Sequence, residues 1–107
     1  MNSFQNSTEF QNELFNKLNL ENEKITNKLF FDCEFHNCNF VNTDLSETNL
    51  SESDFSGSLF DNTNLFKANL KNCINYNINP LNNNIKKVKF SLPEALTLLD
   101  AFEIKIQ

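Results

Sequence analysis

The sequence predicts an all-β fold, a solenoid in which the chain winds into four-sided coils of parallel strands. The first observation is a five-residue repeat from residue 33 to residue 70. This period fits neither a strand, which repeats every two residues, nor a helix at about 3.6 residues per turn. The second observation is that the same large residues recur twenty positions later, which predicts four pentads in each coil. Repeats this short stack, and each unit buries its apolar face against its neighbours.

The register of the repeat assigns the core. The large inward positions are predicted to be Phe30, Phe35, Phe40, Leu45, Leu50, Phe55, Phe60, Leu65 and Leu70. Two residues before eight of them stand the small residues Cys33, Cys38, Thr43, Thr48, Ser53, Ser58, Thr63 and Ala68. A square tube is too narrow for a large side chain at every inward site, so small residues are expected between the large ones. Each buried Leu or Phe should contribute roughly 1.5–3 kcal/mol.

Residues 28–72 resemble the pentapeptide-repeat family. The runs T-D-L-S-E, T-N-L-S-E, S-D-F-S-G and A-N-L-K-N are similar to the family pattern A-(D/N)-L-x-x. The resemblance implies a right-handed quadrilateral parallel β-helix, here of about three coils. The tail F-S-L-P-E-A-L-T-L-L-D-A-F-E-I-K-I is similar to the C-terminal helix and strand of many members. The resemblance weakens over residues 8–27, and Glu13, Glu23 and Lys28 occupy positions expected to be small.

The chain is expected to form a single domain over residues 1–107. Within it, residues 1–17 are assigned to an N-terminal cap, residues 18–80 to the β-helix, and residues 81–107 to a C-terminal strand and helix. The repeat should end near residues 73–80, because the large position turns polar at Asn75 and Pro80 removes a ladder donor.

Residues 8–18 have two interpretations. Phe10 and Phe15 continue the pentad, whereas Phe10, Leu14 and Leu18 form a helical stripe behind a capping box of Thr8 and Gln11. We expect a distorted first coil that covers the open end of the tube, since an exposed strand edge invites association.

The C-terminal segment is predicted to contain a short strand at Val88–Phe90 and a short α-helix over residues 92–102, with Ser91 and Glu94 as its capping box. Ile104–Ile106 should form a final strand. The apolar surface of the helix is wide, and several relatives dimerise through this element. We therefore expect a homodimer joined through Leu92, Leu96, Leu98, Leu99 and Phe102. In this prediction Ala95, Leu99 and Phe102 can also close the last coil, and the alternative is a monomer with the helix folded across that coil.

The composition argues against several partners. Fourteen acidic residues oppose nine lysines, there is no arginine, and the net charge is −5, so nucleic-acid binding is not expected. No run approaches the roughly 20 apolar residues of a membrane span. The N-terminus lacks the features of a secretion signal, and a cytoplasmic protein is expected. Cys33, Cys38 and Cys73 fall on small inward positions, which favours free, buried thiols.

No catalytic, cofactor or metal site is predicted, and the chain is not expected to be an enzyme. Cys33, His36 and Cys38 look at first like metal ligands. The register argues against such a site, because both cysteines point into the tube and His36 points outward. The histidine also has no identifiable nucleophile beside it.

The acidic residues are the more informative group. Asp32 and Glu52 are twenty residues apart, as are Glu34 and Asp54, so all four should line one edge of the tube. This acidic edge is interpreted either as a solvated face or as a docking surface for a basic protein. The sequence favours a non-enzymatic structural or protein-interaction module. The family resemblance implies an alternative, a DNA mimic that binds DNA gyrase and protects it from quinolones, although three coils span only about 14 Å.

Overall fold

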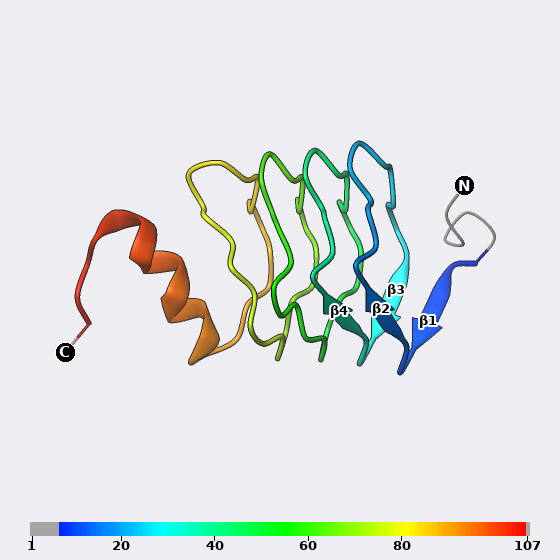
Figure 1. The fold of residues 1–107 in the computed structure, drawn as a ribbon. Coiled ribbons are helices and arrows are strands. Elements are labelled where there is room, and N and C mark those ends of the chain that lie inside the picture. Colours follow the sequence, from blue (N-terminus) through cyan, green and yellow to red (C-terminus); the bar gives the residue numbers. More distant parts are fainter. Residues whose placement is uncertain (1–6, 107) are drawn as a thin grey trace.

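The computed structural model describes residues 7–106 as a stack of coils with one helix at its C-terminal end (Figure 1). Strand β1 (Glu9–Gln11) pairs in parallel with β3 (Leu29–Phe31), and β2 (Leu14–Asn16) pairs in parallel with β4 (Glu34–His36). Isolated parallel bridges continue the first ladder at the same spacing, joining Leu29↔Asn49, Asn49↔Asn69 and Asn69↔Lys89. The predicted parallel β-helix with twenty residues per coil is therefore the observed architecture, and its right hand stays a prediction.

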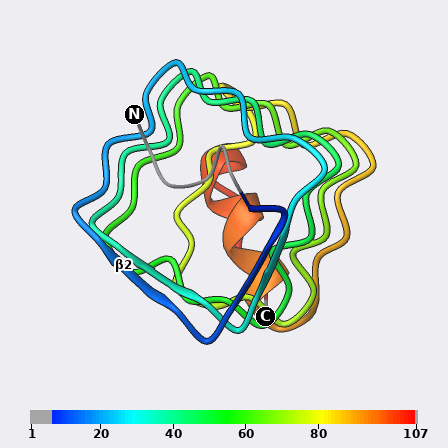
Figure 2. The same cartoon turned by 90° about the vertical axis from the view of Figure 1, so that its right-hand side faces the viewer.

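The coils superimpose as a four-sided outline when the molecule is viewed from its N-terminal end (Figure 2). Left-handed backbone conformations recur every five residues, as at Asn37 (φ 57°), Asn42 (φ 58°) and Asn62 (φ 52°). Asparagine tolerates this region better than most residues, which gives a physical reason for the many asparagines. Gly57 occupies one of these positions with φ 72°, and a Cβ there would collide with the side-chain amide of Asn37.

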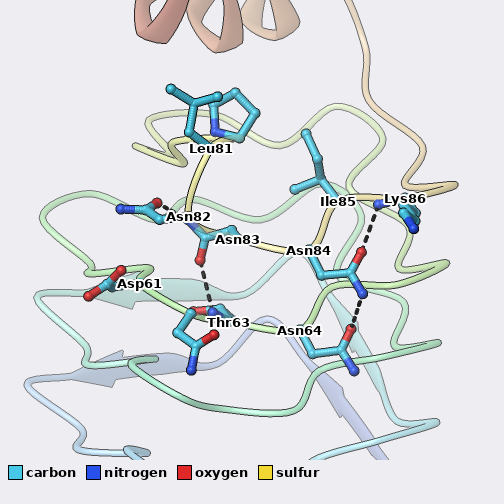
Figure 3. A pocket seen from close by; sticks show the side chains of 11 residues that line it. Asp61, Thr63, Asn64, Leu81, Asn82, Asn83, Asn84, Ile85 and Lys86 are labelled. Atoms are coloured by element: carbon cyan, nitrogen blue, oxygen red, sulfur yellow. Dashed lines mark hydrogen bonds between the residues drawn. The ribbon is translucent and has the colours of Figure 1, made fainter.

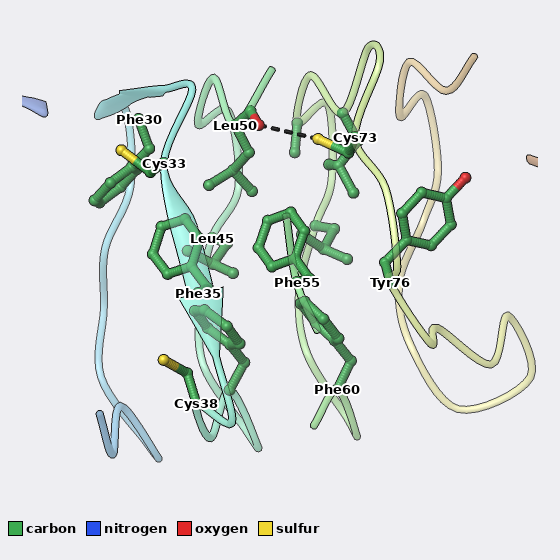
Figure 4. Close-up of a cluster of buried hydrophobic side chains, with 14 of the residues drawn as sticks. Phe30, Cys33, Phe35, Cys38, Leu45, Leu50, Phe55, Phe60, Cys73 and Tyr76 are labelled. Atoms are coloured by element: carbon green, nitrogen blue, oxygen red, sulfur yellow. Dashed lines mark hydrogen bonds between the residues drawn. The ribbon is translucent and has the colours of Figure 1, made fainter. Parts of the chain in front are cut away.

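The interior is filled by columns of large side chains (Figure 4). The rings of Phe35 and Phe55 stack with centroids 5.1 Å apart and planes 6° from parallel, and those of Phe40 and Phe60 stack at 5.0 Å and 9°. Neighbouring columns meet edge to face, since the Phe35 and Phe40 rings lie 5.6 Å apart at 65°. Both arrangements are favoured by aromatic quadrupoles. The buried large residues are Phe30, Phe35, Phe40, Leu45, Leu50, Phe55, Phe60, Leu65 and Leu70.

The small inward residues satisfy the backbone of the preceding coil. The Ser58 hydroxyl donates to the carbonyl of Phe35 at 2.6 Å and accepts the amide of Cys38 at 3.1 Å. The Thr63 hydroxyl donates to the carbonyl of Phe40 at 2.7 Å. In both bonds to a carbonyl, the hydroxyl lies 23 residues after the acceptor, and a thiol shows the same spacing. The Cys73 thiol donates to the Leu50 carbonyl at 3.0 Å, as Figure 4 shows.

The N-terminal segment forms a first coil, as expected. Both β1 and β2 already belong to the ladder, so the pentad interpretation of residues 8–18 is correct and the helical stripe is wrong. Phe10 stacks on Phe30 with ring centroids 4.9 Å apart, whereas Leu14, expected on the stripe, is 60 % exposed. Pairing with β3 and β4 satisfies the backbone of this segment better than an isolated helical turn would. The part of the expected cap over residues 1–6 lies outside the described residues.

The repeat does not end near residues 73–80, as expected, but is interrupted there. Ile78 pairs with Phe60, which is eighteen residues away rather than twenty, and Asn84 then pairs with Asn64 in the regular register. Tyr76 and Ile78 are buried at the irregular side, so they replace the large side chain that Asn75 lacks. Residues 88–90 continue this coil through the bridge at Lys89 and do not form a separate strand.

The C-terminal helix η2 (Glu94–Phe102) is a 3₁₀-helix rather than the predicted α-helix. The expected capping box is also wrong: the N-cap residue is Pro93, and it makes no side-chain cap hydrogen bond. The Ser91 hydroxyl instead accepts a hydrogen bond from the backbone amide of Asn72 at 3.1 Å. The hydroxyl that was expected to cap the helix therefore bonds to the last coil. Within residues 7–106, the tail at residues 104–106 forms no strand.

Replacing Phe55, which is fully buried, with alanine should lower the free energy of unfolding by about 3–5 kcal/mol, because stacked coils cannot collapse into the cavity. Urea denaturation followed by circular dichroism measures the loss. The matched control is Leu59→Ala, since Leu59 is 60 % exposed and should cost no more than about 0.5 kcal/mol. A Phe55→Ala cost below about 1 kcal/mol would contradict the register.

Candidate functional site

The structure places the acidic edge in two adjacent columns. Asp32 and Glu52 occupy the same left-handed position of consecutive coils, with φ 54° and 63°. Glu34 and Asp54 are direct partners in the ladder. One carboxylate of this edge is stabilised by a hydrogen bond, because the Asn72 side-chain amide donates to the Glu52 carboxylate at 2.6 Å.

His36 joins the second acidic column. Its Nε2 atom lies 3.2 Å from Glu34 Oε1 and 3.8 Å from Asp54 Oδ2. One suitable atom from each of the three side chains falls within 4.8 Å of the others. Glu34 and His36 leave the same strand, β4, at alternate positions, and Asp54 comes from the following coil. The three side chains therefore form a small cluster across two coils.

The carboxylate of Asp54 is held in place by its neighbours. Its Oδ1 atom accepts the Ser56 amide at 3.0 Å, the Ser56 hydroxyl at 2.7 Å and the Asn75 side chain at 3.1 Å. Burial acts to raise the pKa of Asp54, but the hydrogen bonds from Ser56 and Asn75 and the proximity of His36 outweigh it. The net result is a pKa below the ordinary value.

The cysteines do not join His36. Cys33, Cys38 and Cys73 are free and buried inside the tube. Burial raises the pKa of Cys33 and Cys38, and it raises the pKa of Cys73 to about 12, so these thiols stay protonated and unreactive. The motif that drew attention in the sequence is thus divided between the inside and the outside of the tube. The sequence signal for the cluster of Glu34, His36 and Asp54 was the spacing of outward residues, two positions apart on one strand and twenty positions apart between coils.

A shallow pocket of about 680 Å³ lies where the repeat is interrupted (Figure 3). It is lined by Asp61, Asn62, Thr63, Asn64, Pro80, Leu81, Asn82, Asn83, Asn84, Ile85 and Lys86. Its side-chain amides bond to the wall itself: the Asn83 side chain accepts the Thr63 amide at 2.9 Å, and Asn84 donates to Asn64 at 3.2 Å. These amides serve the fold and do not converge on a bound molecule.

The predicted dimer residues divide between two faces of η2. Residues three apart share a face of a 3₁₀-helix. One face carries Ala95, Leu98 and Ala101, which are half-buried, and Leu98 packs against the core. The next face carries Leu96, Leu99 and Phe102. Leu96 is 41 % exposed and Phe102 is 50 % exposed. The expected roles of Leu98 and Phe102 are therefore exchanged: Leu98 covers the last coil, and Phe102 faces outward.

Stacked coils, left-handed corners and inward hydroxyls define a β-solenoid built from pentads. The sequence model for pentapeptide repeats matches residues 30–65 and 38–74, with eight copies. The resemblance predicted from the sequence is thereby confirmed over residues 30–74, which match the pentapeptide-repeat family.

Three solved structures illustrate what the chain is similar to. A trypsin-treated form of QnrB1, a plasmid-mediated fluoroquinolone resistance protein, is 18 % identical with a TM-score of 0.53, over 89 % of this chain and 49 % of that one. The present chain thus spans about half the length of QnrB1. The pentapeptide-repeat protein Rfr23 of the cyanobacterium Cyanothece 51142 is 18 % identical with a TM-score of 0.45, over 80 % of this chain and 82 % of its own. No curated protein matches the chain.

A third structure, a pentapeptide-repeat protein of the Arabidopsis thaliana thylakoid lumen, is 20 % identical with a TM-score of 0.29, over 71 % of this chain and 60 % of its own. Among the described residues, no helix combines the length and apolar character needed to cross a membrane. The cytoplasmic location stays a prediction.

Asp54 should make folding sensitive to acid. Because its folded-state pKa lies below the ordinary value of 3.8, the stability that it contributes is present above that value and is lost as the pH falls through the folded pKa. Asp54→Asn should flatten the dependence of the unfolding free energy on pH below about pH 4, as measured by urea melts at a series of pH values. Asp61→Asn, which changes an exposed aspartate, is the control. An unchanged acid slope in Asp54→Asn would contradict the prediction.

Proposed function

We propose that this protein is a non-enzymatic interaction module that acts as a homodimer joined through η2. The observation that carries the proposal is the second apolar face of that helix. While Leu98 packs against the core, the exposed Leu96 and Phe102, together with the half-buried Leu99, present a further apolar row at the end of the molecule. Leu92, 75 % exposed, extends this row beyond the N-terminus of the helix.

A second copy of the chain is the partner that fits this face. Helix η2 lies at one end of the molecule (Figure 1), and a two-fold axis there would bury each apolar row against its equivalent. Exposed Ile104 and Ile106, at 51 % and 59 %, continue the same end of the chain and would add apolar area to the contact. Burial of such area stabilises association by roughly 25 cal/mol per Å² before the entropic costs of binding.

The rest of the surface supports an interaction role over a catalytic one. The thiols, which are the strongest nucleophiles in the sequence, lie inside the tube with raised pKa values. In the pocket at the interrupted coil, the side-chain amides bond to one another and to the backbone. What the coils offer to solvent is a rigid scaffold with ordered columns of polar side chains.

Light scattering after size exclusion tests the dimer. At tens of micromolar we expect a mass of about twice the 12.4 kDa of one chain. The double variant Leu96→Glu with Phe102→Glu should give monomers, because it places four carboxylates in the paired face. Leu59→Glu, a charge at an exposed leucine on the coils, should leave the dimer intact. A wild-type mass near 12.4 kDa would disprove the proposal.

The acidic edge supports a second candidate function, a DNA mimic that binds gyrase. Seven acidic residues and no lysine occur between Asp32 and Asp61, and the structure aligns four of these acids in two columns. The likeness to QnrB1 extends to the fold. A C-terminal dimer would present two acidic edges, one from each chain.

A DNA supercoiling assay with and without a fluoroquinolone tests this candidate. If the acidic edge is the contact, the wild-type chain at micromolar concentration should protect gyrase, and Glu52→Gln with Asp54→Asn should weaken protection at least about tenfold through lost charge pairing. Glu21→Gln with Glu103→Gln removes the same charge outside the edge and should not. Unaltered gyrase activity with the wild-type chain would remove this candidate and leave the first.

A further inference from the structure

We propose that Glu34, His36 and Asp54 form a surface binding site for a divalent transition-metal ion, with Zn²⁺ as the best-matched cation. Histidine nitrogen and carboxylate oxygen are both zinc ligands, and a site with three protein ligands leaves a position for water. This site differs from the Cys33–His36–Cys38 motif, and it goes beyond the interaction function proposed above.

The distances suit a shared ion. Zinc–nitrogen and zinc–oxygen bonds of about 2.0–2.2 Å place neighbouring ligand atoms of a tetrahedral site about 3.3–3.5 Å apart. The Nε2 atom of His36 meets this spacing with Glu34 at 3.2 Å and is close to it with Asp54 at 3.8 Å. Glu34 is the side chain that must adjust, and at 55 % exposure it is free to rotate towards Asp54.

The Nε2 atom of His36 is the second, independent observation. The His36 side chain is 32 % exposed, but its Nε2 atom is buried from solvent, and this atom has no hydrogen-bond partner among residues 7–106. A buried ring nitrogen without a hydrogen bond is costly, and a metal ion would satisfy its lone pair. The nitrogen thus lies between two carboxylates without the geometry of a hydrogen bond to either.

Asp54 is arranged as a pre-oriented ligand. Its Oδ1 atom takes three hydrogen bonds from Ser56 and Asn75, which leaves Oδ2 directed to His36. Such outer contacts fix ligand orientation in protein metal sites. The neighbouring column of Asp32 and Glu52 adds negative potential that would attract a cation. Since Glu34 and His36 belong to one coil and Asp54 to the next, a bound ion would cross-link two coils.

Calorimetric titration of the metal-free full-length protein with ZnCl₂ tests the site. We expect one saturable equivalent and a melting temperature that rises with zinc. His36→Gln should weaken binding at least about tenfold, as is typical for loss of a metal contact, and should abolish the thermal shift. Asp61→Asn, an acid outside the cluster, should change neither. Ser56→Ala should weaken binding through Asp54, and Ser56→Thr should restore it.

Two results would overturn the proposal. The first is the absence of saturable zinc binding, or binding that His36→Gln leaves unchanged, which would indicate nonspecific attraction to acidic residues. Equal competition by MgCl₂ has the same meaning, because imidazole favours zinc over magnesium. The second is a thiolate charge-transfer band on titration with Co²⁺, which would place the metal on the cysteines. Cobalt spectra without that band, and lost in His36→Gln, would support the proposed site.

Discussion

The whole fold depends on satisfying one set of backbone carbonyls. The ladder uses the N–H of a large core residue, as when Phe35 donates to the carbonyl of Asp54, and its own carbonyl is usually met by the next coil's small inward residue, as Ser58 does for Phe35. Leu45 is an exception, because Ala68 has no hydroxyl and Thr48 of the same coil donates to the Leu45 carbonyl instead. An unsatisfied buried carbonyl would cost about 1–3 kcal/mol. Serine, threonine and cysteine are small enough for the narrow tube and still donate a hydrogen bond, so they recur between the large residues. Small size and the ability to donate a hydrogen bond together determine which residues occupy the small inward positions of the repeat.

This constraint explains how much of the fold could be predicted. The pentad spacing alone determines which residues face inward, so the columns of Phe35 and Phe55 follow from counting residues. The two ends could not be predicted in the same way, because there tertiary contacts replace the repeat. Asn75 and Pro80 break the pattern, yet Tyr76 and Ile78 fill the tube from a shifted register. A polar residue at a large position was therefore an interruption and not an end.

The surface sites, too, could be predicted only where they follow the spacing of the repeat. The twenty-residue spacing was enough to place Glu34 beside Asp54. It was not enough to give His36 its partners, since that contact depends on side-chain rotation from a neighbouring position on β4. Likewise, the apolar pattern of η2 was visible in the sequence, but its division into faces follows the 3₁₀ period and not the expected α-helical one. Ser91 bonds to the last coil and does not cap the helix, which local sequence rules do not capture.

Changes in chain length affect the core and the surface of the four-sided coil differently. Inserting or deleting a single pentad would keep every later large residue inside the tube, because the inward rule has a period of five. It would also turn all later outward residues by one side relative to the earlier ones, and a pentad placed between residues 34 and 54 would remove the alignment of Glu34 with Asp54. Only a change of a whole coil preserves both. Evolution of this architecture can therefore lengthen the scaffold in steps of four pentads while keeping its surface pattern, and a one-pentad step creates a new surface on an unchanged core.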